Sequence, residues 1–148
     1  MKTLALALLL LGPISAAAPV EDLAAARAEP DPERRSDKFL QVADASFKFA
    51  RKAAKEGDVA AEKAALENIR EAVALAIQSL RESGKNARQN PKHFKIAELE
   101  LRKLMRGLDD FRYAKSADQR PETDDLGAAL REAHDEVLMG IMTKKPKN

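Results

Sequence analysis

The two histidines, His93 and His134, are the side chains in this chain best suited to bind a metal. A di-metal carboxylate site in a helical bundle takes inward glutamates and a Glu-x-x-His pair on each of two helices. Neither histidine has a glutamate three residues before it, because Asn90 and Arg131 occupy those positions. The apolar stripes described below also contain no acidic residue. The sequence therefore predicts no metal site.

A non-covalent haem would need a histidine ligand, usually opposed by a methionine or a second histidine. His134 lies beside an apolar stripe, and Met105 and Met142 are available as second ligands. The competing interpretation is a half-solvated histidine beside Leu130 and Leu138, with the methionines filling the core. We favour this second interpretation and expect no cofactor. A small carrier or sensor that encloses a ligand such as haem is the alternative.

The usual motifs of catalysis are missing from the sequence. It contains no cysteine, no Gly-x-Ser-x-Gly turn and no glycine-rich phosphate loop. Its acidic residues fall on the hydrophilic faces of the predicted helices. We therefore expect a protein that is not an enzyme and has no catalytic residue.

The first residues have the layout of a secretory signal. A basic start, Met1 and Lys2, precedes an apolar run over residues 4–11 and small residues over 15–18. A membrane anchor is the alternative, but it needs about 20 apolar residues and Gly12 and Pro13 interrupt the run after eight. We predict a cleaved signal peptide over residues 1–17 and an exported protein, periplasmic or secreted. Without cysteine, the exported chain has neither a lipid anchor nor disulfides.

The remaining length is enough for one domain with a core of its own. The whole chain carries 26 Lys or Arg and 24 Asp or Glu, so its charge is nearly balanced. This balance favours neither nucleic acid nor a membrane surface as a partner. We expect a flexible leader over residues 18–30, a bundle over 31–143 and a charged tail over 144–148.

Helical periodicity and end signals predict four helices, over residues 32–56, 59–82, 91–113 and 119–142. Asp31, Asp58, Asn90 and Asp118 are placed to cap their first turns, and Gly57 can end the first helix in the left-handed conformation. Apolar residues three and four apart form one stripe on each helix. The stripes are Phe39, Ala43, Phe47, Ala50 and Ala54; Leu66, Ile69, Val73, Ala76, Ile77 and Leu80; Phe94, Ala97, Leu101, Leu104, Leu108 and Phe111; and Leu126, Leu130, Ala133, Val137 and Ile141.

Four helices of similar length with short connections predict an all-α, up-down-up-down antiparallel four-helix bundle. A three-helix core with the first helix partly detached is the alternative. It would expose phenylalanines of the first helix, which argues against it.

Charge is distributed unevenly along the chain. Residues 81–106 contain eight Lys or Arg and three Glu, whereas residues 121–139 contain six acids and one Arg. One interpretation is that the last two helices are neighbours whose charges complement each other. The other is a basic outer face on the third helix that binds an anionic partner. The candidate partner-binding residues of that face are Lys95, Leu99, Arg102, Arg106 and Tyr113.

Residues 83–142 contain SGKNARQNPKHFKIAELELRKLMRGLDDFR, then DQRP, then HDEVLMGIM. This half of the chain resembles a group of small secreted bacterial proteins of unknown function. The resemblance implies an exported helical protein without assigned catalytic residues. The sequence thus predicts a non-enzymatic interaction or structural protein of the cell envelope.

Overall fold

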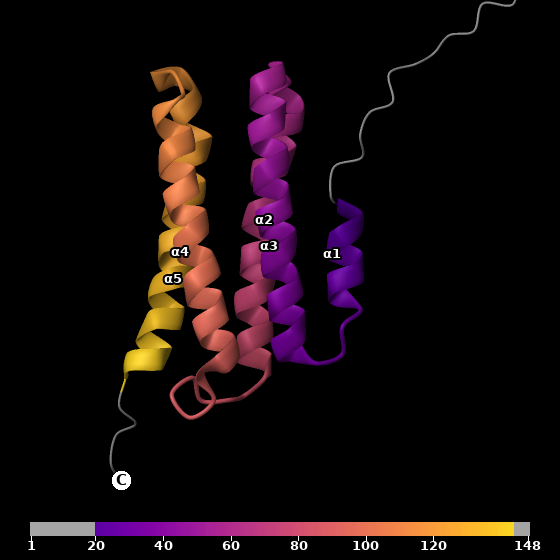
Figure 1. The fold of residues 1–148 in the computed structure, drawn as a ribbon, viewed down its shortest axis with the longest axis vertical. Coiled ribbons are helices and arrows are strands. Elements are labelled where there is room, and N and C mark those ends of the chain that lie inside the picture. The colour runs from indigo at the N-terminus through magenta and orange to yellow at the C-terminus, as the bar shows by residue number, and fades with distance from the viewer. Residues whose placement is uncertain (1–19, 144–148) are drawn as a thin grey trace, which may run out of the picture.

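The computed structural model describes residues 20–143, and all regular structure in this range is helical (Figure 1). The helices are α1 (Val20–Arg27), α2 (Pro32–Glu56), α3 (Val59–Glu82), α4 (Pro91–Tyr113) and α5 (Arg120–Met142), with a short 3₁₀ turn, η1 (Ala117–Gln119), before α5. The ranges of α2, α3 and α4 are those expected from the sequence, and α5 begins one residue later. The expected signal peptide, residues 1–17, and the tail, residues 144–148, lie outside the described residues.

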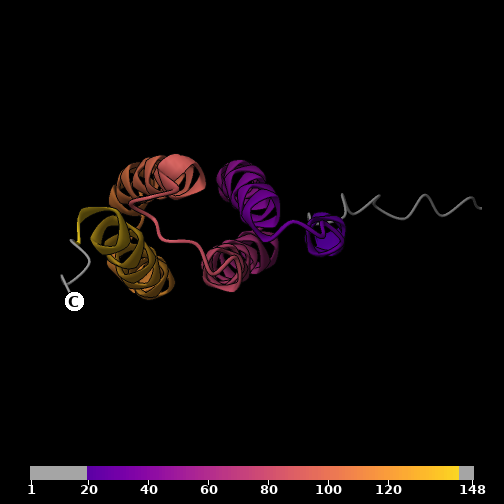
Figure 2. The ribbon, with the colours of Figure 1, turned by 90° about the horizontal axis from the view of Figure 1, so that it is seen from below.

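The four long helices pack together as two pairs, α2 with α3 and α4 with α5 (Figure 2). The pairs join because α2 also packs on α4 and α3 also packs on α5. As a result α3 and α4, which are consecutive in the chain, lie diagonally across the group. Loop 83–90 connects them along this diagonal.

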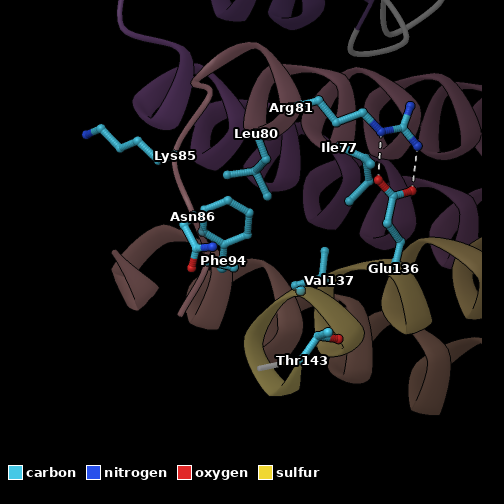
Figure 3. Close-up of a pocket in the computed structure, with 11 residues that line it drawn as sticks. Ile77, Leu80, Arg81, Lys85, Asn86, Phe94, Glu136, Val137 and Thr143 are labelled. Carbon is cyan, nitrogen blue, oxygen red and sulfur yellow. Dashed lines mark hydrogen bonds and ion pairs between the residues drawn. The ribbon is translucent and has the colours of Figure 1, made fainter. Parts of the chain in front are cut away.

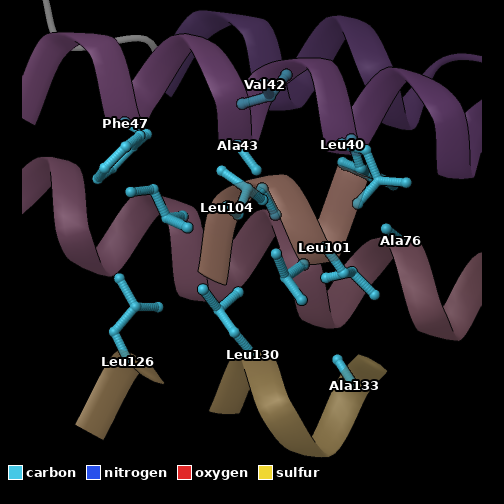
Figure 4. Packing of buried hydrophobic residues seen from close by; sticks show 14 of the residues in the cluster. Leu40, Val42, Ala43, Phe47, Ala76, Leu101, Leu104, Leu126, Leu130 and Ala133 are labelled. Atoms are coloured by element: carbon cyan, nitrogen blue, oxygen red, sulfur yellow. The ribbon is translucent and has the colours of Figure 1, made fainter. Parts of the chain in front are cut away.

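The core is built from the four predicted stripes (Figure 4). Their members are buried except Ala54, Phe94 and Ile141, which are half-buried and pack against the core. Phe39 and Phe47 of α2 are 1% and 7% exposed. The alternative of a three-helix core with the first helix detached is therefore wrong. No helix within residues 20–143 combines the length and the apolar character needed to cross a membrane.

Three of the predicted helix-end signals are present in the structure. The Asp31 side chain accepts a hydrogen bond from Arg34 N at 2.9 Å, and Asp58 accepts one from Ala61 N at 3.0 Å. Gly57 ends α2 with φ 71°, a conformation that costs glycine little. These three predictions are confirmed.

Two predicted caps are wrong. Asn90 precedes α4, but its side chain makes no capping hydrogen bond. Instead, Asn86 earlier in the loop accepts from the amides of Arg88 and Gln89 at 3.0 and 3.2 Å. Asp118 lies inside η1 rather than at the start of α5. In both places a hydrogen-bonded turn, with Asn90 N donating to Asn86 O and Gln119 N donating to Ser116 O, directly precedes the helix and includes the residue predicted as its cap.

The expected leader, residues 18–30, is helical over α1, so the prediction of a flexible segment is wrong there. Leu23 and Ala26 of α1 are 5% and 2% exposed and belong to the same apolar cluster as the α2 stripe. Arg27 reaches Glu71 of α3 at 2.6 Å. The segment has few large apolar groups, but Leu23 and Ala26 are one turn apart and can be buried together.

Candidate functional site

The five candidate partner-binding residues share one outward face of α4, which we call the α4 stripe: Lys95, Leu99, Arg102, Arg106 and Tyr113. All five are exposed, and Leu99 and Tyr113 keep 56% and 75% of their surface accessible. The spacing of three, four and seven residues places them along one line of the helix, opposite the buried stripe. The structure therefore brings these residues together on an accessible surface.

Arg102 is already engaged within the protein. Its Nη2 donates to Oε2 of Glu98 at 2.8 Å, and the other oxygen of Glu98 lies 3.0 Å from Nε2 of His134 in α5. These two hydrogen bonds, the one with His134 first, hold the pKa of Glu98 below its ordinary value. The side chains of Glu98 and His134 are 15% and 14% exposed, so the contact between α4 and α5 is largely shielded from water.

Lys95 and Arg106 form no ion pair with any carboxylate among residues 20–143. The acids of α5 are instead shared between two neighbours. Asp124 pairs with Arg112 of α4, whereas Glu122 and Glu136 pair with Lys63 and Arg81 of α3. Charge complementarity between the last two helices is therefore present but leaves Lys95 and Arg106 free. The partners of these acidic residues cannot be predicted from the sequence, because α5 packs against α3 as well as α4.

His134 is already engaged within the protein. Its Nε2 is hydrogen-bonded to Glu98, and Met142 is 68% exposed. Axial ligation through Nε2 would break the contact with Glu98. No group of three or more potential metal ligands lies together within residues 20–143.

His93 forms a second histidine–carboxylate pair, with Nδ1 2.8 Å from Oδ2 of Asp37 in α2. Burial raises the pKa of Asp37, and the hydrogen bond from His93 opposes this effect only in part. The other oxygen of Asp37 is buried without a partner in the described part of the chain. This pair joins α2 to α4 and is a structural contact between helices.

A pocket of about 490 Å³ opens where α3, loop 83–90, α4 and α5 meet (Figure 3). Its walls are mainly apolar, and Arg81, Lys85, Asn86, Glu136 and Thr143 form its polar part. The apolar lining residues are Ile77, Leu80, Ala87, Phe94, Val137 and Gly140. The sequence did not predict this pocket, because its lining residues come from three helices, α3, α4 and α5, and from the loop that connects α3 to α4. The only feature of the sequence that could have indicated a pocket here is the polar loop 83–90 next to the apolar end of α3.

Comparison with known proteins identifies no relative. No family model, curated protein or solved structure matches this chain. The resemblance of residues 83–142 to small secreted bacterial proteins therefore stays a prediction.

Proposed function

We propose that this chain is an exported, non-enzymatic interaction protein of the cell envelope, which binds an acidic protein surface through the α4 stripe. The observation that carries the proposal is the pair of unengaged cations on either side of an exposed leucine. Lys95 and Arg106 have no carboxylate partner among residues 20–143, and Leu99 lies between them with 56% of its surface accessible. Such a pattern offers charge and apolar area together, as protein-binding surfaces do.

An acidic protein fits the stripe better than an anionic membrane. Asp109 and Asp110 are exposed between Arg106 and Tyr113. A flat anionic surface that reached Arg106 would also meet these two carboxylates and be repelled. A folded protein can place its acids opposite Lys95 and Arg106 and an apolar or aromatic contact opposite Tyr113.

Export of the chain is supported by the basic start, the apolar run and the small residues within positions 1–18. Expression of the full chain in a bacterial host, followed by fractionation and intact-mass measurement, tests this part. We expect a soluble envelope product that begins at residue 17 or 18. A full-length product in the membrane fraction would contradict export as a free protein.

We also propose that the four long helices alternate in direction, as in an up-down-up-down bundle. Arg35 near the start of α2 donates to Ser79 near the end of α3 at 3.1 Å, which supports this order for the first pair. The contact between Arg112 and Asp124 supports it for α4 and α5. The chain lacks cysteine, so a spin label can be attached at each introduced cysteine. If α2 and α3 are antiparallel, labels at Lys52→Cys and Lys63→Cys should lie closer together than labels at Lys52→Cys and Gln78→Cys.

The stripe is tested by binding of poly-L-glutamate at low ionic strength, measured by fluorescence anisotropy. The informative variant is Lys95→Glu with Arg106→Glu, because it leaves intact both the contact of Arg102 with Glu98 and the contact of Glu98 with His134. We expect affinity to fall about tenfold in this variant, with the circular dichroism unchanged. Raising the salt concentration should weaken binding by the native protein.

The matched control is Arg34→Glu with Lys55→Glu, which makes the same charge change on exposed residues of α2. Neither of these cations forms an ion pair in the described part of the chain. An equal loss in the control would show that net charge alone causes binding. Binding to phosphatidylglycerol vesicles without binding to poly-L-glutamate would replace the acidic protein with a lipid surface and overturn the proposal.

A further inference from the structure

The pocket at the end of the bundle shares no residue with the α4 stripe. It lies between the ends of α3 and α5, with loop 83–90 and the start of α4 beside it (Figure 3). Its volume of about 490 Å³ falls within the range of small-molecule sites, roughly 300–1,000 Å³. The apolar walls include Ile77, Leu80 and Val137, whose surfaces are only 5%, 3% and 3% exposed. The pocket is therefore lined on its apolar side by buried residues of α3 and α5.

The side-chain oxygens of Asn86 and Glu136 at the mouth already accept hydrogen bonds within the protein. Asn86 Oδ1 accepts from the amides of Arg88 and Gln89. Both carboxylate oxygens of Glu136 accept from Arg81, at 2.6 and 2.5 Å. The Thr143 hydroxyl donates its proton to the Met139 carbonyl oxygen at 2.6 Å, which leaves its oxygen as an acceptor. A ligand that brings a hydrogen-bond donor would therefore meet Thr143, because the side-chain oxygens of Asn86 and Glu136 are already engaged.

Several donors at the same mouth remain without partners. Nη1 of Arg81, Nδ2 of Asn86 and the backbone amides of Asn86 and Ala87 have no hydrogen-bond acceptor among residues 20–143. Lys85 adds a positive charge, which it shares with Glu33 of α2. Asn86 lies beside Phe94, so its free amide is next to the apolar wall (Figure 3). This arrangement suits a ligand with an acceptor group on an apolar body.

From the apolar walls and the surplus of donors we propose that the pocket binds a small amphiphile with an aliphatic body and a carboxylate. The aliphatic part lies between α3 and α5, against Leu80 and Val137. The carboxylate lies at the mouth beside loop 83–90, where Nδ2 of Asn86 donates to it. Charge-assisted hydrogen bonds of this kind are about twice as strong as neutral ones, so the site prefers the anion over a neutral analogue.

Sodium decanoate is the probe, measured by isothermal titration calorimetry, with decan-1-ol as the neutral analogue. We expect saturable one-to-one binding of decanoate with a Kd below about 1 mM and at least about fivefold weaker binding of decanol. In a ¹⁵N-labelled sample, the shifts of amides in loop 83–90 and the ends of α3 and α5 should move with the titration. Equal affinity for decanol would overturn the proposed role of the carboxylate, and absence of saturation would overturn the site.

Two variants separate the head from the body of the ligand. Asn86→Asp keeps the acceptor for Arg88 and Gln89 but replaces the free donor with a negative charge, so decanoate should bind about tenfold more weakly while decanol is unaffected. Asn90→Asp is the matched control, because Asn90 is outside the pocket and its side chain caps nothing. An equal loss in Asn90→Asp would show a nonspecific charge effect and contradict the proposal.

Ala87→Leu fills the pocket from the loop side and should weaken both probes about tenfold. Ala128→Leu, on the exposed side of α5, should leave both affinities unchanged. If Ala87→Leu alters the circular dichroism, the Asn86→Asp result alone decides the matter. Unchanged binding in a folded Ala87→Leu protein would place the amphiphile elsewhere and overturn the site.

Discussion

The ring of Phe47 in α2 occupies the space that a side chain at Gly107 of α4 would need. A Cβ at Gly107 would stand 2.6 Å from Cε1 of Phe47. The ring is buried and packs edge-on against Phe111, with the ring centroids 6.0 Å apart, and Arg51 lies over its face at 5.5 Å. Gly107 therefore determines how closely α2 and α4 approach.

We expect Gly107→Ala to lower the free energy of unfolding by about 1 kcal/mol, because displacing a held ring outweighs the gain in helix propensity. Gly127 of α5 is the matched control, since a Cβ there first meets the flexible guanidinium of Arg131, at 3.4 Å. Gly127→Ala should raise the free energy of unfolding by about 0.5–1 kcal/mol. Urea denaturation measures both values. A stabilised Gly107→Ala protein would show that Phe47 moves aside at little cost.

Two fully buried serines of α2 should respond to alanine with opposite signs. Ser46 Oγ accepts from Asn68 Nδ2 at 2.7 Å and donates to the Val42 carbonyl at 2.8 Å. Ser46→Ala leaves the buried Asn68 amide without this partner and should cost about 1–3 kcal/mol of unfolding free energy.

Ser36 provides the comparison, because its Oγ is buried without a partner in the described residues. Ser36→Ala removes an unsatisfied hydroxyl and should leave the free energy of unfolding unchanged or raise it by up to about 1 kcal/mol. Thermal or urea unfolding of the two variants in parallel gives the test. A destabilised Ser36→Ala protein would indicate that a water or another group satisfies this hydroxyl in solution.

The contact of Glu98 with His134 predicts a pH dependence of stability. The pKa of Glu98 is lowered in the folded protein by its hydrogen bonds with His134 and Arg102. Its contribution is therefore complete above the unfolded-state value of about 4.3 and is lost as the pH falls through the lower folded pKa. Glu98→Gln should be less stable than the native protein at pH 6, with the difference shrinking below about pH 4. A difference that stays constant over this range would contradict the shift.

The helix α1 should be held mainly by Leu23 rather than by its ion pair. Leu23 is 5% exposed, whereas Arg27 and Glu71 are each 53% exposed, and exposed pairs contribute little. Leu23→Ala should therefore speed amide hydrogen exchange in α1 while exchange in α3 and α4 stays unchanged. Arg27→Ala should leave exchange in α1 nearly as slow as in the native protein. The reverse order of the two effects would make the ion pair the main attachment.

Helix ends and buried faces of this protein are largely local properties, which is why they could be predicted from sequence. At the start of α2, the hydrogen-bond acceptor Asp31 directly precedes Pro32, and at its end Gly57 in the left-handed conformation directly precedes the next cap, Asp58. The apolar period of each helix likewise depends only on its own residues. The exposure of the α4 stripe follows in the same way, since it lies opposite Leu101 and Leu104.

Only the tertiary structure decided which helices are neighbours. The apolar period of a helix shows which of its faces is buried but not which helix packs against that face. The diagonal placement of α3 and α4 could therefore not be predicted from the sequence. That placement puts α3 beside α5 and brings Arg81 to Glu136, whereas the packing of α5 on α4 brings His134 to Glu98. The diagonal placement also forms the pocket, because residues 77 and 137 meet only when loop 83–90 crosses the end of the bundle. Contacts between distant segments depend on packing, which a single helix does not encode.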